Sequence, residues 1–270
     1  MLNDNELDRF INDLWEMHGY DFTDYSKASL QRRMSRLFLI DKINDFPEFS
    51  SRLLNNPGYL QHVVEEITVN VTEMFRDPLF YKALRETVIP IIATHPFIRI
   101  WHAGCSTGEE VYSMAIILKE MNLLHKTLLY ATDLNPNVLD VLKKGIFPLG
   151  HIKLFAENYI ASGGEKDFSC YYTAKYDLAK FDQQLRERVV VSTHNLVSDS
   201  SFNEFQLILC RNVLIYFESK LQDRVFRLFE QSLDSSGFLA LGAKETLRYS
   251  NSSGLFKVFN LKERIWRKSR

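Results

Sequence analysis

The chain has 270 residues, of which 46% are hydrophobic and 25% are charged, and its formal net charge at pH 7 is −1. This is the composition of a soluble globular protein, and the length suffices for one large or two modest domains. A net charge so close to zero disfavours a broad nucleic-acid-binding surface. Cys105, Cys170 and Cys210 form no C-x-x-C pair, so we expect neither a disulfide framework nor a metal site. The sequence has no signal-peptide pattern and no apolar run that could span a bilayer, so we expect a cytoplasmic protein without membrane insertion.

The first part of the chain, up to about residue 77, has helical periodicity throughout. Apolar residues recur at helical spacing in four segments, at 7–15, 30–37, 46–54 and 60–67. Turn signals separate the segments: His18-Gly19, Asp45-Phe46-Pro47 and Asn55-Asn56-Pro57-Gly58. We therefore expect a small all-helical domain with a linker over residues 1–77.

The pattern changes at Asp77-Pro78, which resembles an N-cap followed by a proline at the first position of a helix over 79–92. Strands are then expected at 97–101, 128–132, 189–193, 205–210 and 237–241, with a closing hairpin at 256–260 and 264–268. This alternation predicts an α/β domain over residues 78–270 with a doubly wound, mostly parallel sheet. Residues 147–185 fit the alternation badly, and we interpret them as an insertion between the second and third major strands.

The sequence WHAGCSTGEE at residues 101–110, which follows the first expected strand, carries the strongest local signal of a ligand site. A strand, a turn of small residues and a helix is the arrangement by which α/β folds present backbone to a nucleotide-like ligand. The loop matches neither G-x-G-x-x-G nor a P-loop, and glycines such as Gly104 and Gly108 also occur in purely structural turns. Of the two acids that begin the helix, Glu109 and Glu110, one suits the helix dipole, whereas the other would repel a phosphate and attract an ammonium group. S-adenosylmethionine, an amino acid joined to a nucleoside, is a ligand of that kind.

Polar residues also follow the other expected strands, whose carboxyl ends face the ligand crevice in doubly wound folds. Asp133 ends the second strand, where an acid either accepts hydrogen bonds from ribose hydroxyls or caps the helix that begins near Pro136. Asn195 follows the third strand, and its amide suits the edge of an adenine ring or an ordinary turn. Two further groups fit either a ligand site or structural roles. They are Arg211, Asn212 and Tyr216 after the fourth strand, and Asn70, Thr72 and Arg76 in the linker.

These residues belong to motifs that follow one another along the chain. The motifs are N-x-T-x-x-F-R at 70–76, C-S-T-G-E-E-x-Y-S at 105–113, T-D at 132–133, N-L at 195–196 and C-R-N-V-x-I-Y-F at 210–217. In this order they resemble the CheR family, the chemotaxis receptor glutamate O-methyltransferases. The resemblance extends over nearly the whole chain and includes the helical part, with Gly19-Tyr20-Asp21-Phe22 and Arg32-Arg33.

The resemblance implies the fold of S-adenosylmethionine-dependent methyltransferases and a role for each motif residue. Glu110 is expected to hold the methionine part of the cofactor, and Asp133 its ribose. Arg76 and Tyr216 are expected beside the transferred methyl group, where they orient the incoming carboxylate; Arg76 also touches the cofactor. The remaining cofactor-binding residues are Asn70, Thr72, Asn195, Leu196, Arg211 and Asn212.

The implied reaction methylates glutamate side chains of a chemoreceptor or related signalling protein and leaves S-adenosylhomocysteine. A glutamate of ordinary pKa is ionised at neutral pH, so this reaction requires no general base. The alternatives are a non-catalytic S-adenosylmethionine-sensing module and a methyltransferase for another substrate. The implied partner is the helical bundle of a receptor, and the enzyme is expected to be a monomer. A basic helix with Lys27, Arg32, Arg33 and Arg36 would contact that partner, unless its charges are only solvated.

Two features depart from the family pattern. His102 stands where the family usually has a small residue, so we expect a different rim of the cofactor pocket. The insertion at 147–185 is longer than in simple members, and we expect it to form a small β-subdomain at the periphery. Its Ser162-Gly163-Gly164 only partly matches the Gly-rich loop with which some members dock a receptor tail.

Overall fold

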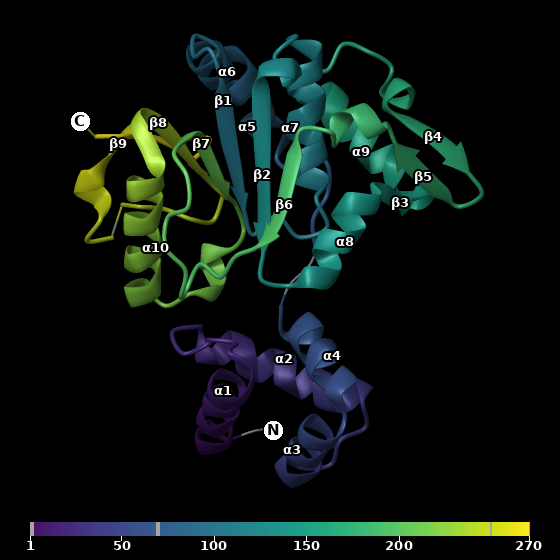
Figure 1. Ribbon diagram of the computed structural model, residues 1–270, viewed down its shortest axis with the longest axis vertical. Helices are drawn as coiled ribbons and strands as arrows, with labels where there is room; N and C mark the ends of the chain where they lie inside the picture. Colours follow the sequence, from purple (N-terminus) through teal and green to yellow (C-terminus); the bar gives the residue numbers. More distant parts are fainter. Residues whose placement is uncertain (1–2, 69–70, 249, 270) are drawn as a thin grey trace. The chain divides into compact units, whose positions relative to one another are not determined.

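The computed structural model describes residues 3–68, 71–248 and 250–269 (Figure 1). The chain divides into two compact units. One comprises Met1–Asn70 with Tyr216–Arg224, and the other comprises Val71–Ile215 with Val225–Arg270. Within the described ranges, no helix combines the length and the apolar character that a membrane span requires.

The first unit contains the helices α1 (Asp4–His18), α2 (Lys27–Ile40), α3 (Phe46–Asn55) and α4 (Pro57–Ile67). Local sequence sets where they begin: Asn3 and Glu6 form a capping box at α1, and the Asp45 side chain caps α3. Their apolar faces meet in a buried core in which the ring centroids of Phe10 and Phe49 are 5.3 Å apart. The expected all-helical amino-terminal domain is confirmed.

A segment from much later in the chain, Tyr216–Arg224, completes this unit. The backbone N–H of Ser26 donates to the carbonyl oxygen of Tyr216 at 2.9 Å, and Tyr25 and Phe217 form an isolated β-bridge. The rings of Tyr25 and Phe217 also meet edge to face, with centroids 4.8 Å apart. The helical domain is therefore not formed by the amino-terminal residues alone.

The second unit is built on a seven-stranded sheet with the strand order β6-β2-β1-β7-β8-β10-β9 (Figure 1). Its strands are β1 (Ile98–Ala103), β2 (Thr127–Asp133), β6 (Val189–Thr193), β7 (Phe205–Cys210), β8 (Leu233–Leu241), β9 (Phe256–Asn260) and β10 (Ile265–Lys268). The strands from β6 to β8 in this order pair in parallel, whereas β10 is antiparallel to both β8 and β9. The predicted mostly parallel sheet with a closing hairpin is confirmed. The order reverses between β1 and β7, and ligands of doubly wound folds bind outside the carboxyl ends of strands at such a point.

Helices cover both faces of the sheet. Since successive residues of a strand point to opposite faces, neighbouring residues of one strand contact helices on opposite sides. Ile100 of β1 belongs to the buried cluster that contains Met114 and Ile117 of α7 (Glu109–Glu120). The next residue, Trp101, packs on the other side, with its ring 5.5 Å from that of Phe229 in α10 (Ser219–Ser232). A third helix, α8 (Pro136–Lys144), follows β2.

The helix expected over 79–92 is present but is not uniform. It consists of α5 (Pro78–Ala83), a π-helical turn (Leu84–Val88) and α6 (Ile89–Ile92). The wide turn ends two residues before Pro90, which lacks an N–H group and disfavours a regular helix in the turn before it. Asp77 occupies the predicted N-cap position before Pro78, with φ +59°, but its side chain makes no capping hydrogen bond.

The insertion forms a small antiparallel sheet in the order β3-β5-β4, which confirms the expected β-subdomain. Its elements are β3 (Ile146–Pro148), α9 (Ile152–Ala161), β4 (Tyr172–Lys175) and β5 (Leu178–Phe181). The small sheet lies at the edge of the domain in Figure 1, but most aromatic residues of the insertion belong to the main buried cluster. The fully buried Tyr159 packs with its ring 5.3 Å from that of Phe75 in the linker. The hydroxyls of Tyr159 and Tyr171 both donate to Glu120 at the end of α7.

Candidate active site

The turn between β1 and α7 closes onto the end of β2. The backbone N–H groups of Gly104 and Cys105 both donate to the carbonyl oxygen of Thr132, each at 2.9 Å. Gly104 has φ +76°, and a Cβ atom there would lie 2.5 Å from a methyl carbon of Val213. The backbone conformation and the close packing therefore both require glycine at position 104.

Asp133, the last residue of β2, stabilises this turn with its side chain. One carboxylate oxygen accepts the backbone N–H of Ser106 at 2.9 Å, and the other accepts that of Asn135 at 3.0 Å. The side chain of Asn135, not that of Asp133, caps α8, so the alternative capping role of Asp133 is wrong. Burial raises the pKa of the Asp133 carboxyl, and the backbone N–H groups partly oppose this shift.

The two acids at the start of α7 have different surroundings. Glu109 is buried with the hydroxyl of Thr107 as a donor at 2.6 Å, and burial raises its pKa to about 7. Burial also opposes ionisation of Glu110, but hydrogen bonds and positive charge from His102 and Arg211 outweigh it and lower the pKa of this carboxyl. Glu110 is therefore the acid that carries a stable negative charge at the end of the sheet.

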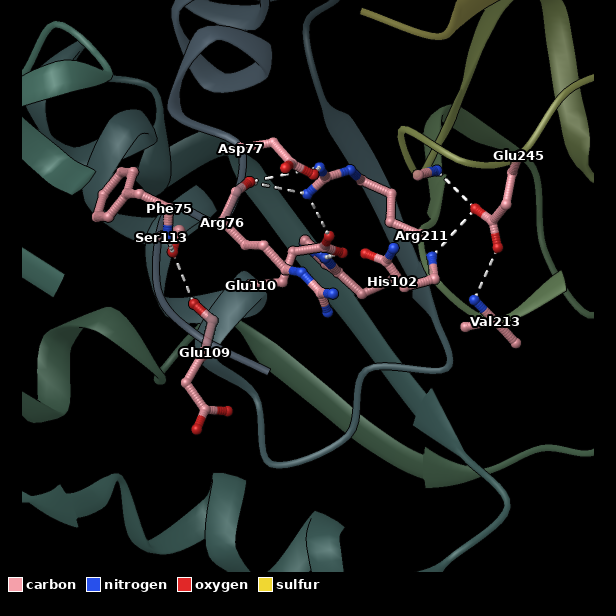
Figure 2. Close-up of polar contacts among 12 residues, drawn as sticks. Phe75, Arg76, Asp77, His102, Glu109, Glu110, Ser113, Arg211, Val213 and Glu245 are labelled. Atoms are coloured by element: carbon pink, nitrogen blue, oxygen red, sulfur yellow. Dashed lines mark hydrogen bonds and ion pairs between the residues drawn. The ribbon is translucent and has the colours of Figure 1, made fainter. Parts of the chain in front are cut away.

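A chain of charged groups joins Glu110 to the linker (Figure 2). One oxygen of Glu110 lies 2.9 Å from Nδ1 of His102, and the other lies 3.4 Å from Nη1 of Arg211. Nη2 of Arg211 donates to the carboxylate of Asp77 at 2.6 Å, and both terminal nitrogens approach the carbonyl oxygen of Arg76. The guanidinium also lies over the ring of Phe80, 4.0 Å from its centroid. Arg211 is thereby fixed between two acids and an aromatic face.

The side chain of His102, the residue at which we expected the pocket rim to differ, is fully buried. It lies on β1, one residue before the strand ends, and its ring N–H at Nδ1 is positioned to donate to the ionised Glu110. A sequence pattern could not reveal this contact, since the two residues come from different elements. The effect of the unusual histidine is therefore to hold an acid of the site.

The linker motif lies partly outside the described residues, because Asn70 is not among them. Thr72 is half-buried, and Arg76 makes a long hydrogen bond of 3.4 Å to the carbonyl of Val71. The motif itself is anchored by its backbone: the N–H of Phe75 donates to the hydroxyl of Ser113 on α7 at 2.8 Å. The linker is thus attached to the helix that begins with Glu109 and Glu110.

The segment after β6 brings Asn195 and Leu196 to the same end of the sheet as Asp133. Asn195 shapes a turn, because its side-chain oxygen accepts the N–H of Val197 at 2.9 Å and its own N–H donates to Asp199 at 2.8 Å. Leu196 is buried. The predicted adenine contacts of these two residues remain predictions.

The segment after β7 is held by an acid that the sequence reasoning missed. Asn212 has φ +61°, and its backbone N–H donates to the buried carboxylate of Glu245 at 3.0 Å. Glu245 follows β8. Because ligands of doubly wound folds bind at the carboxyl ends of the strands, an acid at this position could have been recognised from the sequence. Figure 2 shows Glu245 beside Arg211 and Val213.

Tyr216 lies in the first unit, whereas Arg76, Glu110 and Arg211 lie in the second. Within its unit, the ring of Tyr216 packs against Arg33 of α2, whose guanidinium carbon is 4.4 Å from the ring centroid. Arg33 also donates to the carbonyl of Ile67. The predicted convergence of Tyr216 and Arg76 on one atom therefore stays a prediction.

The polar groups at the strand ends fit a ligand with both amino-acid and nucleoside parts. Several buried nitrogen and oxygen atoms there have no hydrogen-bond partner within the described part of the chain. They are Nε2 of His102, Oγ of Ser106, Nδ2 of Asn135 and Nε of Arg211. Buried polar atoms are normally paired, so such a group around Glu110 and Asp133 is consistent with a bound polar ligand.

Comparison with known proteins gives the family. Residues 5–68 match the all-alpha domain of CheR methyltransferases, and residues 70–265 match their SAM binding domain. A Pseudomonas putida protein that carries the name methyltransferase Cher3 is 44% identical over 266 residues, which cover 98% of this chain and 97% of that protein. Chemotaxis protein methyltransferases of Borreliella burgdorferi and Salmonella typhimurium are 28% and 27% identical, over 90% and 97% of this chain and 89% and 88% of their own lengths. The chain therefore belongs to the CheR family of S-adenosylmethionine-dependent methyltransferases.

Proposed function

We propose that this enzyme transfers the methyl group of S-adenosylmethionine to glutamate side chains of a chemoreceptor or a related signalling protein. The products are a glutamyl methyl ester and S-adenosylhomocysteine. The observation that carries the proposal is the ionised Glu110 at the start of α7, held by His102 and Arg211 beside the glycine turn. A fixed negative charge at this place suits the ammonium group of the cofactor's methionine part.

We assign the other cofactor contacts by motif. Asp133 accepts the ribose hydroxyls, Asn195 and Leu196 line the adenine, and Arg211 and Asn212 complete the site. The linker residues Asn70, Thr72 and Arg76 also contact the cofactor. In Asp133 both oxygens already accept a backbone N–H, so this carboxylate is held in place before any ligand binds.

In the reaction, a carboxylate oxygen of the substrate bonds to the methyl carbon, and the carbon–sulfur bond breaks with its electrons returning to sulfur. The cofactor supplies an activated methyl group on a positively charged sulfur. The substrate glutamate is already ionised at neutral pH, so no residue of the enzyme must remove a proton. Arg76 and Tyr216 orient the carboxylate, and a water-poor site favours the loss of charge on the way to the transition state.

The same proposal assigns the domains and the location. Residues 1–77 form the helical domain and linker that recognise the receptor, and residues 78–270 form the catalytic domain. The enzyme acts as a monomer in the cytoplasm on the helical bundle of the receptor. In α2, Arg32 and Arg36 are exposed, whereas Lys27 forms an ion pair with Asp8 at 2.6 Å.

Methyl transfer from labelled S-adenosylmethionine to purified cytoplasmic receptor fragments tests the function. We expect label on the fragment that base releases as methanol, and no label once the accepting glutamates are replaced by alanine. Asp133→Ala should weaken binding of S-adenosylhomocysteine by ~1–3 kcal/mol, because the ribose hydroxyls lose a charged acceptor. Base-stable label would indicate another acceptor group. Binding of S-adenosylhomocysteine without any transfer would instead support a sensing module.

A further inference from the structure

Glu245 is a buried acid that holds backbone rather than another side chain. Only 4% of the residue is exposed, and its carboxylate accepts four backbone N–H groups. One oxygen accepts from Gly242 at 2.6 Å and Asn212 at 3.0 Å, and the other from Val213 at 2.8 Å and Ile215 at 3.3 Å. Figure 2 shows the bond from Val213. Charge-assisted hydrogen bonds of this kind are stronger than those between neutral groups. A single side chain therefore fixes the backbone of the whole segment 212–215.

These bonds join the ends of two neighbouring strands. Glu245 follows β8, whereas the N–H groups of residues 212–215 follow β7, and the last residues of the two strands, Cys210 and Leu241, are paired in register. The backbones approach so closely that a Cβ atom on Gly242 would lie 2.7 Å from the backbone nitrogen of Asn212. The conformation held there is uncommon, since Asn212 has a positive φ of 61°.

The segment that Glu245 fixes carries groups of the proposed cofactor site. It directly follows Arg211, whose guanidinium meets Glu110 and Asp77. It also contains Val213, which packs on the glycine turn so closely that one of its methyl carbons would lie 2.5 Å from a Cβ atom on residue 104. A shift of this segment would therefore move both a charged group of the site and the wall against which the glycine turn packs.

We propose that Glu245 is a positioning residue for cofactor binding, which acts by fixing the segment 212–215, next to Arg211, on the glycine turn. This inference rests on the proposed function, since it takes the sheet end as the S-adenosylmethionine site. The carboxylate touches no ligand itself. It holds the backbone at the spacing that Arg211 needs in order to meet Glu110.

The test compares Glu245→Gln with Glu245→Asp, and uses Asp234→Asn as a matched control. Asp234 is also a buried acid on β8, but it lies near the first residue of the strand, away from the site, where it accepts the backbone N–H of Ser236 at 2.6 Å. A glutamine places an amide donor against backbone donors, whereas an aspartate keeps the charge with a shorter reach. Binding of S-adenosylhomocysteine by calorimetry and thermal unfolding are measured for all variants.

We expect Glu245→Gln to raise the dissociation constant for S-adenosylhomocysteine at least tenfold in folded protein, and Glu245→Asp to restore part of the affinity. Asp234→Asn should lower the unfolding temperature without this loss. In turnover assays, Glu245→Gln should raise KM for S-adenosylmethionine more than it lowers kcat. Affinity within twofold of wild type, an equal loss in Asp234→Asn, or an effect confined to kcat would each overturn the inference.

Amide exchange separates this inference from the proposed function. In the cofactor-free enzyme, the amides of residues 212, 213, 215 and 242 should exchange slowly, and Glu245→Gln should accelerate these amides selectively. If wild type fails to bind S-adenosylhomocysteine, the proposed function is wrong, and the role in cofactor binding is wrong with it. If wild type binds and Glu245→Gln binds equally well, only the role of Glu245 is wrong.

Discussion

The Nη2 atom of Arg211 lies 2.6 Å from the Oδ2 atom of Asp77, although 134 positions separate the two residues in the chain. The pair joins the end of β7 to the start of the helix that follows the linker. The Arg211 side chain is only 3% exposed, whereas that of Asp77 is 41% exposed. The buried guanidinium of Arg211 is therefore paired with two acids, the partly exposed Asp77 and the more buried Glu110.

Asp77→Ala should weaken cofactor binding although Asp77 itself belongs to no motif. Arg211 would keep Glu110 as its only acidic partner and would compete more strongly with the ligand's ammonium group for that carboxylate. We expect a loss of about 1–2 kcal/mol in the free energy of binding S-adenosylhomocysteine, less than for a fully buried pair because Asp77 is partly exposed. Calorimetry checks this, with Asp140→Ala, which removes an exposed pair with Lys143, as the control. Equal affinities of the two variants would contradict the prediction.

Glu109 should make the stability of the enzyme depend on pH. Its folded pKa of about 7 lies above the ordinary value of 4.5, so the folded state favours the protonated form. The stability that this group contributes is fully present below pH 4.5 and is lost as the pH rises through 7. Glu109→Gln cannot ionise and should be the more stable protein at pH 8.5 by ~3 kcal/mol, a difference that vanishes near pH 4.5. Urea unfolding of both proteins at several pH values measures this, and a difference independent of pH would refute it.

The sequence predicted the sheet well, because its strands are runs of apolar and β-branched residues between turn signals, both in the buried β7 and in the edge strand β6. The strands at 189–193 and 205–210 coincide with β6 and β7. Helix α9 and the core position of the insertion were not predictable, because Tyr159 and Phe168 become core residues only when Phe75 of the linker packs against them. Periodicity within a segment does not report such contacts between segments.

For the same reason, the sequence predicted some residues of the site but not the side chains that hold them. Glu110, Asp133 and Arg211 follow strands or begin a helix, so their places could be read from the order of elements. The partners of Glu110 and Arg211 could not, because His102 and Asp77 reach them across the fold. Asp77 holds the predicted N-cap position without a capping hydrogen bond for a physical reason: an acid before proline is a good N-cap, but the buried guanidinium of Arg211 is a stronger attraction for its carboxylate.

Charge reversal on α2 should reduce methylation of the receptor while leaving the cofactor site intact. Arg32 and Arg36 are exposed and lie one helical turn apart, so they present two positive charges to a partner. Arg32→Glu with Arg36→Glu should raise KM for the receptor fragment severalfold, and the effect should diminish at high salt. Lys27→Ala is the control, since Lys27 is already paired with Asp8. An unchanged KM in the double variant would show that these charges are only solvated.

Arg76 and Tyr216 should affect catalysis more than cofactor binding. We propose from the family motifs that both contact the substrate beside the transferred methyl group, Arg76 from the linker and Tyr216 from the segment after β7. Orientation of the incoming carboxylate by two groups from separate elements affects the rate steeply, because effective molarity depends on geometry. Arg76→Ala and Tyr216→Phe should therefore lower the rate constant for methyl transfer at saturating cofactor, with Arg76→Ala the more damaging because it also removes a charge.

Single-turnover kinetics measures that rate constant, and calorimetry with S-adenosylhomocysteine measures affinity in the same variants. The position of Tyr216 supplies a further control, because its ring packs against Arg33 in the helical unit. Tyr216→Phe keeps the ring that Arg33 covers, but it also removes a hydroxyl that interacts with Arg33, so thermal unfolding of the variant is measured beside its rate to detect any disturbance of the helical unit. Arg33→Ala, by contrast, should lower the stability of that unit. If both Arg76→Ala and Tyr216→Phe transfer the methyl group at the wild-type rate, these residues are structural and other groups place the carboxylate.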